Sequence, residues 1–216
     1  MKKGIDCFIL YTDAETTAAT LSQLHHEPLV NNVYVLLRED EACSMEGYKT
    51  IRVKGRSSSA AVRSIADAAT APYVLFFAKK AKITLGYQAL RRYFMVAESV
   101  DPAIVYADRY VERDGKLTPK PTMDFYYGSV RDDFDFGSLV LISTSLLREY
   151  LKEKPEANYQ YAAWYDLQLF ALRRKRQAAL FHVREFLYTE EEPAQSQQEG
   201  EQQFDYVNPR NREVQK

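Results

Sequence analysis

The feature that most constrains the fold is an alternation of short apolar segments with helix-forming segments through the first half of the chain. Residues 73–77 are apolar at every position, as expected for a central strand of a parallel sheet that is covered on both faces. Shorter apolar segments that predict further strands lie at residues 5–11, 33–37, 50–53 and 103–106. This β-α-β-β-α-β-α-β order indicates an α/β domain with an open, mostly parallel (mixed) sheet and helices on both faces.

Capping and helix-breaking residues place the helices between these strands. One helix is predicted at residues 16–26, closed by Pro28, and an Ala-rich one at residues 57–70. Thr84 is predicted to cap a third helix, which runs to about residue 99. Ligands of such sheets bind at the carboxyl ends of the strands. The loops expected to form a site therefore follow Tyr11, Leu37, Phe77 and Tyr106.

The second half of the chain is less regular. It contains a turn at residues 113–116 and an acidic, aromatic loop at residues 131–137. The elements predicted after this loop are a strand at 139–142, a helix opening at Thr144, a helix at 161–174 and a strand at 180–183. We expect one domain at residues 1–189, then a polar linker rich in Glu, Gln and Ser at 190–203. An aromatic tail at 204–216 is expected to dock or to lead into a further region.

The charge balance argues neither for nucleic acid nor for an acidic membrane surface as a partner, and no nucleic acid is expected. Lys plus Arg is 29 and Asp plus Glu is 30, so the formal net charge is only -1. No apolar run approaches the roughly 20 residues that span a bilayer, and the start of the chain lacks the pattern of a signal peptide. We therefore expect a cytoplasmic protein without a transmembrane segment, with the inner face of the membrane as an alternative place of action.

Several common site motifs are absent from the sequence. No Gly-x-Gly-x-x-Gly follows the first strand, no Walker A lysine loop is present, and no serine lies in a Gly-x-Ser-x-Gly elbow. The three histidines and two cysteines do not have zinc-ligand spacing. These absences weigh against a dehydrogenase, a P-loop enzyme, an α/β-hydrolase and a zinc hydrolase.

Three stretches together suggest a family. Residues 59–77 contain a small-residue helix followed by an apolar strand, and residues 136–150 a later strand and helix. Residues 165–188 contain an acidic helix, its arginine and a Glu-Phe-Leu-Tyr segment. In order and spacing these stretches resemble glycosyltransferase family 2, which has the GT-A fold, over residues 5–188. The resemblance implies a GT-A-like sheet and transfer of a sugar from a nucleotide-sugar donor to a hydroxyl of a saccharide or lipid-linked acceptor in glycan biosynthesis.

The chain departs from the family at the metal site. In the family, an Asp-x-Asp pair after the central strand holds a divalent metal on the donor diphosphate, and the metal assists departure of the nucleotide. Here the pair falls on Ala78 and Lys80, which cannot ligate a hard cation. No metal ligand and no cofactor are therefore assigned, with Mg²⁺ or Mn²⁺ at a relocated site kept as the alternative.

The donor site implied by the resemblance is basic. Lys79 and Lys80 are predicted to replace the metal as counter-charge for the diphosphate, or else to form a solvated turn. Arg38 and Arg63 are predicted to add bidentate contacts. Asp13 is expected to bind the nucleobase or ribose, or only to cap the following helix. The predicted donor-binding residues are Thr12, Asp13, Arg38, Arg63, Lys79, Lys80 and Asp108.

The acceptor side is assigned to the second half of the chain. The family's late acidic pair falls on Ala163 and Trp164, which leaves Asp166 as the nearest carboxylate. Asp166 is predicted either to remove the acceptor proton or to form a structural ion pair in the core. Acceptor contacts are assigned to Asp133, Asp135 and Trp164. Solvated turn residues are the alternative for the aspartates, and core packing for the tryptophan.

Three functions stay open on the sequence. The first is a glycosyltransferase that is independent of metal. The second is a non-catalytic relative that binds a nucleotide-sugar or a glycan, or a module of a larger glycan-assembly enzyme. The third, a sugar nucleotidyltransferase, requires a glycine-rich basic loop that residues 11–20 lack. A homodimer or a partner domain in a larger chain is compatible with all three.

Overall fold

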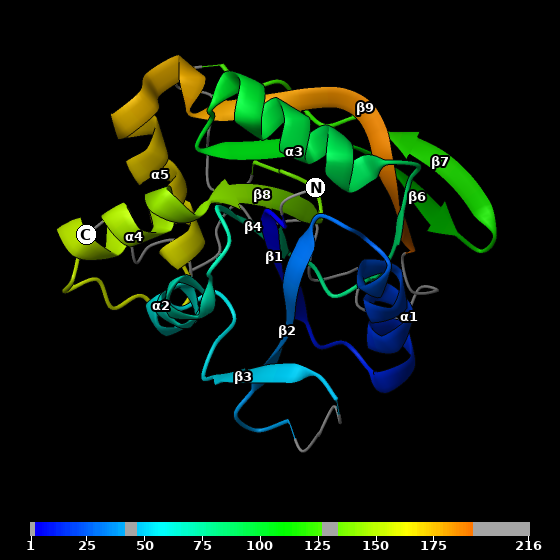
Figure 1. Ribbon diagram of the computed structural model, residues 1–216, viewed down its shortest axis with the longest axis horizontal. Coiled ribbons are helices and arrows are strands. Elements are labelled where there is room, and N and C mark those ends of the chain that lie inside the picture. Colours follow the sequence, from blue (N-terminus) through cyan, green and yellow to red (C-terminus); the bar gives the residue numbers. More distant parts are fainter. Residues whose placement is uncertain (1–2, 42–46, 127–133, 192–216) are drawn as a thin grey trace, which may run out of the picture.

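The computed structural model describes residues 3–41, 47–126 and 134–191. These residues form a mixed α/β fold with helices on both faces of one sheet (Figure 1). Along the chain the elements are β1 (Ile5–Leu10), α1 (Ala14–His25), β2 (Val30–Arg38), β3 (Lys49–Val53), α2 (Ser59–Ala68), β4 (Tyr73–Phe77), β5 (Lys82–Leu85), α3 (Ala89–Val100), β6 (Ile104–Arg113), β7 (Lys116–Lys120), β8 (Leu139–Ser143), α4 (Thr144–Glu153), α5 (Ala163–Lys175), η1 (Arg176–Ala178) and β9 (Leu180–Glu191).

The described strands form one nine-stranded sheet in the order β3-β2-β1-β4-β8-β6-β9-β5, with β7 paired to β6. The first four strands of this order are parallel to one another. β8 is inserted antiparallel between β4 and β6, and β9 runs parallel to β6. The predicted mixed sheet is therefore confirmed, with its parallel half built from the first half of the chain.

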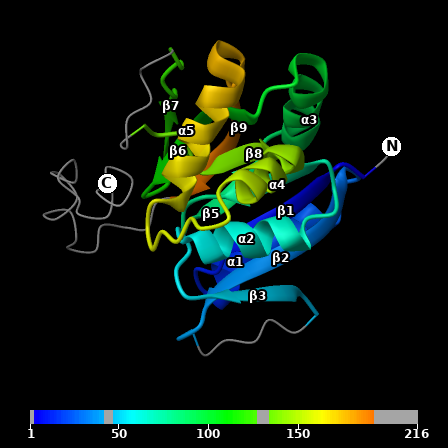
Figure 2. The same ribbon diagram turned by 90° about the vertical axis from the view of Figure 1, so that its left-hand side faces the viewer.

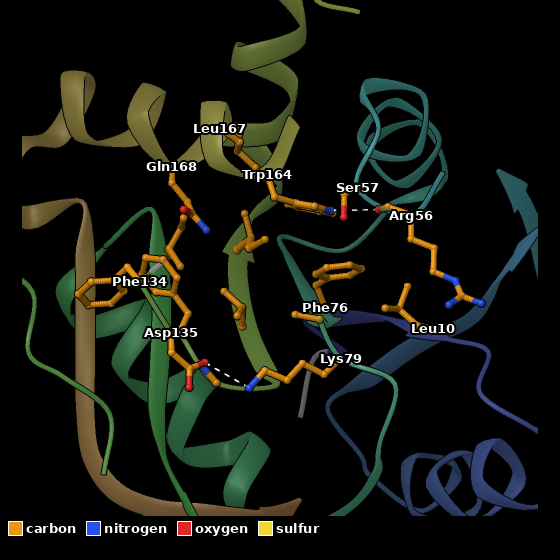
Figure 3. A pocket seen from close by; sticks show the side chains of 16 residues that line it. Leu10, Arg56, Ser57, Phe76, Lys79, Phe134, Asp135, Trp164, Leu167 and Gln168 are labelled. Carbon is orange, nitrogen blue, oxygen red and sulfur yellow. Dashed lines mark hydrogen bonds and ion pairs between the residues drawn. The ribbon is translucent and has the colours of Figure 1, made fainter. Parts of the chain in front are cut away.

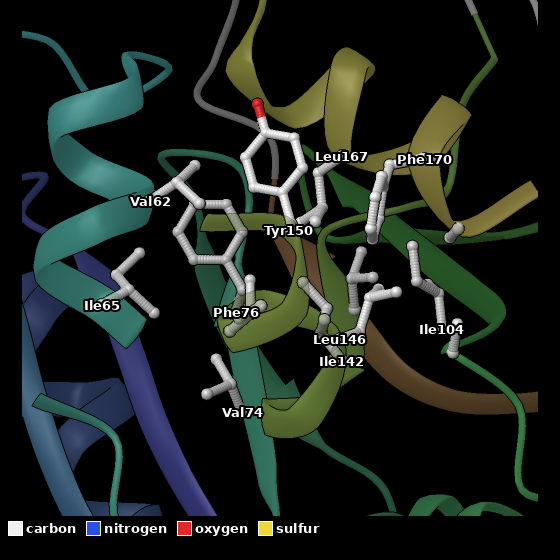
Figure 4. Packing of buried hydrophobic residues seen from close by; sticks show 14 of the residues in the cluster. Val62, Ile65, Val74, Phe76, Ile104, Ile142, Leu146, Tyr150, Leu167 and Phe170 are labelled. Carbon is white, nitrogen blue, oxygen red and sulfur yellow. The ribbon is translucent and has the colours of Figure 1, made fainter. Parts of the chain in front are cut away.

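The sheet has a buried core on each face. Helices α2, α4 and α5 cover one face, which Figure 2 views directly, and α1 and α3 cover the other. Val74 and Phe76 of β4 pack into the first core beside α2 and α5 (Figure 4), whereas Leu75 and Phe77 pack into the second. Each buried side chain of this size contributes about 1.5–3 kcal/mol. Burial on both faces explains why this strand is apolar at every position.

Asp6 is a buried carboxylate at the amino end of β1, opposite to the edge where ligands of such sheets bind. Its Oδ2 accepts the backbone N–H groups of Thr70 and Ala71 at 2.6 and 2.7 Å, and its Oδ1 accepts the side-chain amides of Asn31 and Asn32 at 3.0 Å. Burial raises the pKa of Asp6, but these hydrogen bonds outweigh burial and the pKa is lowered. Asp6 therefore ties β1, β2 and the entry to β4 together.

The prediction that Thr84 caps a helix is wrong. Residues 82–85 form β5, which pairs antiparallel with the end of β9, and α3 begins at Ala89. The β-branched residues Ile83 and Thr84 suit this pairing, but their partners lie more than 100 positions later in the sequence. β9 also continues through Glu190 and Glu191, which the sequence analysis assigned to the linker. Residues 192–216 lie outside the described part of the chain.

Two glycines with positive φ allow a matched test of packing. Gly115 (φ 73°) lies in the β6–β7 turn, which the sequence predicted, and a Cβ there would meet nothing within 4 Å. Gly137 (φ 80°) precedes β8, and a Cβ there would lie 2.3 Å from the hydroxyl of Tyr188. Tyr188 is 1% exposed, and its hydroxyl accepts the backbone N–H of Ser138 at 2.7 Å, so it has no room to move away.

Gly137→Ala should therefore destabilise the protein more than Gly115→Ala. Both variants incur the backbone strain of an alanine at positive φ, about 1 kcal/mol. Gly137→Ala should add about 1–3 kcal/mol of overpacking. Urea unfolding followed by circular dichroism measures both losses. Equal losses in the two variants would contradict the tight contact with Tyr188.

Candidate functional site

A cavity of about 260 Å³ lies beside the carboxyl ends of β1 and β4 (Figure 3). Leu10 and Phe76 contribute its wall from these two strands, and Val140 and Ile142 contribute from β8. Lys79 follows β4 and reaches the same cavity. The position agrees with the expectation that ligands of an open α/β sheet bind where the parallel strands end.

The apolar wall of the cavity is completed by Trp164 from α5. Its ring stacks on Phe76, with 4.3 Å between ring centroids and an angle of 22° between planes. Its indole N–H donates to the backbone oxygen of Arg56 at 3.2 Å, which fixes the ring against the segment before α2. Phe134 faces these rings across the cavity (Figure 3). Trp164 thus lines the cavity with one ring face packed on Phe76, and its predicted acceptor role stays a prediction.

An ion network that is only partly buried borders the cavity on the side of Lys79. Lys79 Nζ lies 3.3 Å from Asp135 Oδ1 and 4.0 Å from Glu190 Oε1. Arg109, which is 1% exposed in β6, donates to Asp135 Oδ2 at 2.6 Å, and its Nε lies 2.9 Å from Glu190 Oε2. Burial raises the pKa of Asp135, but the charges of Lys79 and Arg109 outweigh burial and hold this pKa well below its usual range. Asp135 is therefore a charged anchor and a weak proton acceptor.

A second group of charges surrounds Glu41, at the end of the β2 segment. Its Oε1 contacts Arg56 Nη2 in a short ion pair and lies 3.4 Å from Lys80 Nζ. Its Oε2 accepts the backbone N–H of Arg38 at 2.8 Å. Arg56 Nη2 also donates to the backbone oxygen of Tyr11 at 3.1 Å. These contacts connect the carboxyl ends of β1, β2 and β4.

The other predicted donor residues lie apart from this edge or have local partners. Arg38 pairs with Asp40 at 2.5 Å and is exposed. Asp13 caps α1 by accepting the N–H of Thr16 at 2.8 Å, and the N–H of Thr12 donates to Thr17 at 3.3 Å. The contacts of Asp13 and Thr12 match the alternative prediction that these residues only cap the following helix.

Arg63 and Asp166 each contact α4 or the connection that follows it. Arg63 donates to the backbone oxygen of Pro155 at 3.3 Å, in the connection from α4 to α5. Asp166 is 1% exposed, accepts the hydroxyl of Tyr150 at 2.9 Å and lies 2.6 Å from Lys154 Nζ. The structure therefore places Asp166 in the ion pair that was the alternative to a proton acceptor, directed toward α4.

Asp108 belongs to a separate network on β6 and β9. Its carboxylate accepts the N–H of Thr122 at 2.6 Å and lies 2.8 Å from His182 Nε2. His182 Nδ1 lies 2.6 Å from Asp124, and its ring stacks on Tyr106 with 4.9 Å between centroids. This network attaches the segment after β7 to the sheet, and Asp108 does not line the cavity.

Asp133 lies outside the described residues, so the structure does not place the acceptor contact predicted for it. Within residues 3–41, 47–126 and 134–191, no group of three or more His, Cys, Asp or Glu side chains is arranged to hold a metal ion. No helix in these same ranges is long and apolar enough to cross a membrane.

The sequence analysis missed Arg56, Glu41 and Arg109. Arg56 directly precedes the serines that cap α2, a position that faces the strand ends in this kind of sheet. Arg109 follows the apolar run of β6, and a charge within a strand that is otherwise buried is a signal that was available. Glu41 had no such signal, because its cationic partners Arg56 and Lys80 lie 15 and 39 positions away in the sequence.

Comparison with known proteins supports the fold. No protein-family description matches the chain, and neither does any curated protein sequence. Among solved structures, S. aureus TarS 1-349 matches with a TM-score of 0.57 and 11% identity over 86% of this chain and 60% of that one. Its complexes with UDP and with UDP-GlcNAc match with TM-scores of 0.58 and 0.57 at 12% and 11% identity, over 88% and 89% of this chain and 60% of each TarS chain.

A mycobacterial protein matches similarly, with a TM-score of 0.57 and 13% identity over 90% of this chain and 69% of its own. The chain spans only 60% of the length of the TarS 1-349 structures. At these identities the likeness establishes the fold, which is GT-A-like, as the sequence analysis predicted.

Asp135 should make the stability of the protein depend on pH. Because its pKa is lower in the folded protein than the value of about 3.9 expected for an unfolded chain, its contribution is complete above that value and is lost as pH falls below it. Asp135→Asn should cost about 1–2 kcal/mol at pH 7, since the side chain is 45% exposed and partly screened.

The difference between wild type and Asp135→Asn in urea unfolding should shrink as pH is lowered from 5 to 2. Asp67→Asn, at an exposed position of α2, is the control and should leave stability nearly unchanged. A constant difference across this pH range would contradict the charged anchor.

Proposed function

We propose that this chain binds a nucleoside diphosphate sugar at the carboxyl edge of its sheet and transfers the sugar to an acceptor hydroxyl. The observation that carries the proposal is that Arg56 and Lys79 line the cavity where a GT-A-like sheet ends, while Lys80 joins Arg56 through their shared partner Glu41. The likeness to TarS, whose structures include complexes with UDP and UDP-GlcNAc, supports a nucleotide-sugar as the ligand class.

The basic side chains would take over the electrostatic role of a metal. A leaving nucleoside diphosphate gains negative charge in the transition state, and fixed cations nearby stabilise that charge. Lysine acts on phosphate as a point charge and arginine as a planar, bidentate donor. Since Lys79, Lys80 and Arg56 are parts of the chain itself, binding of the diphosphate would not require a divalent ion.

The cavity supports a sugar as the group that lies next to the diphosphate. Trp164, Phe76 and Phe134 offer ring faces against which the apolar face of a sugar can pack. Gln168 and Asp135 at its rim offer polar atoms for hydroxyl groups. A saccharide or lipid-linked acceptor would approach from the side of Trp164 and residues 134–137.

A second candidate is a domain that binds the nucleotide-sugar without turning it over, or a module of a larger glycan-assembly enzyme. It is favoured because neither Asp166 nor Asp135 is well suited to remove the acceptor proton. Asp166 is engaged by Lys154 and Tyr150, and Asp135 has a strongly lowered pKa. A proton acceptor needs a pKa near the working pH and hydrogen-bond reach to the acceptor.

Donor binding should be independent of metal and dependent on Lys80. Calorimetric titration with UDP, GDP and their sugars should give the same dissociation constant with and without EDTA. Lys80→Ala should weaken binding about tenfold, which corresponds to the loss of one charge-assisted contact. Lys120→Ala, at an exposed position of β7, is the matched control and should bind like wild type. Strict dependence on a divalent metal would contradict the proposal.

Asp166 separates the two candidates. If it removes the acceptor proton, Asp166→Asn should abolish sugar transfer while the dissociation constant for the donor stays within about twofold. Because the substitution leaves the ammonium of Lys154 without its partner, thermal unfolding must first show that the variant is folded. Transfer that persists in the folded variant rules out this role. A wild-type protein that binds the donor but neither transfers nor hydrolyses it supports the second candidate.

A further inference from the structure

The carboxylate of Glu41 lies among the cationic side chains at the carboxyl edge of the sheet. Both oxygens of Glu41 are engaged, Oε1 by Arg56 Nη2 and Lys80 Nζ and Oε2 by the backbone N–H of Arg38. The donors come from three separate segments, namely the end of β2, the loop before α2 and the turn after β4. The side chains of Arg56 and Glu41 are only 15% and 17% exposed.

These donors have the character of a phosphate site. Two cations and one backbone N–H converge on a single oxyanion, and phosphate oxygens accept from the same types of donor. With Glu41 in place, its one negative charge faces two positive charges. Without it, Arg56 and Lys80 would present two unopposed charges, which suits a group that carries two negative charges.

An unused donor of Arg56 points to the same conclusion. Its Nε is buried and has no hydrogen-bond partner among the described residues. Buried donors are nearly always satisfied, and an unsatisfied one calls for a partner other than the described side chains, such as a water or a bound oxyanion. Glu41 therefore satisfies this anion site only in part, and an additional oxyanion would complete the guanidinium's contacts.

The site adjoins the cavity. Arg56 lines the cavity together with Ser57, and Lys79, the neighbour of Lys80, lines it from the turn after β4 (Figure 3). A phosphate group held by Arg56 and Lys80 would thus lie beside the cavity that the stacked rings of Trp164 and Phe76 line.

We infer that Glu41 is an internal competitor of the donor: in the free protein it occupies a phosphate subsite formed by Arg56, Lys80 and the N–H of Arg38, and it leaves when a diphosphate binds. This inference rests on the proposed function, because it identifies a subsite for the same ligand. When the binding-competent state is only a fraction of the molecules, the apparent dissociation constant rises in inverse proportion to that fraction. Removal of the competing charge should therefore tighten binding.

Glu41→Gln is the decisive variant, because glutamine keeps the length of the side chain and loses its charge. Calorimetric titration with UDP and with inorganic pyrophosphate should show binding about tenfold tighter than to wild type, as expected for a competitor that occupies the subsite in about nine molecules of ten. Uridine, which lacks phosphate, should bind both proteins equally. Glu39→Gln, at an exposed neighbouring position, is the matched control and should bind like wild type.

A double-variant cycle adds a second readout. Because Lys80 contacts both the competitor and the proposed ligand, the gain from Glu41→Gln should be smaller in the Lys80→Ala background than in wild type. Circular dichroism and thermal unfolding establish that each variant is folded. A gain that is equal in the two backgrounds would overturn the assignment of Lys80 to this subsite.

The outcomes separate the inference from the proposed function. If UDP binds wild type and folded Glu41→Gln equally, or binds the variant more weakly, the competitor role is overturned while nucleotide binding stands. If pyrophosphate binds Glu41→Gln more tightly than wild type but no nucleotide-sugar binds either protein, the phosphate subsite stands and the proposed function fails. Absence of binding by any probe to any variant overturns both.

Discussion

The site depends on the ion pairs that the buried guanidinium of Arg109 forms. A charge that is 1% exposed in the middle of a sheet is tolerated only with paired and hydrogen-bonded partners. Its partners are Asp135 and Glu190. This requirement explains why β9 extends to residues whose composition resembles a linker. It also explains why the chain turns at Gly137, so that Asp135 can reach the guanidinium.

The same network positions the first lysine of the basic edge. Asp135 and Glu190 face Arg109 with one side and Lys79 with the other, so two cations share two carboxylates. Lys79 is thereby held at the cavity beside the apolar wall. The position of a candidate ligand-binding residue after β4 thus follows from a charge buried in β6, two strands away in the sheet.

Elements with local signals were predictable, and those that depend on distant partners were not. The two-sided burial of β4 and the β6–β7 turn follow from residues within each segment. β5 exists because the far end of β9 offers it an edge, and no short window of sequence contains that information. The site divides in the same way. Lys79, Lys80 and Trp164 were predicted as site residues because the family resemblance placed its motifs at or beside them, whereas Glu41 needed the three-dimensional meeting of β2, β4 and the loop before α2. Asp166 shows the limit of helical spacing, because two positions from Trp164 it turns toward α4.

In the proposed function lysines take the place of a metal, and this changes the electrostatics of the site when no ligand is bound. An acidic pair without its metal is negatively charged and can bind a cation from solution. Positively charged side chains that are held close together without a ligand repel one another. In this chain, carboxylates offset the repulsion between the cations. Glu41 contacts Arg56 and Lys80, and Asp135 and Glu190 lie near Lys79. A metal can also depart with the product, but an ammonium group cannot. In the proposed function, the carboxylates would return to the cations as the nucleotide leaves. They would then supply the countercharge that solvent must otherwise provide. Stability of the free protein and release of the product would therefore depend on the same contacts.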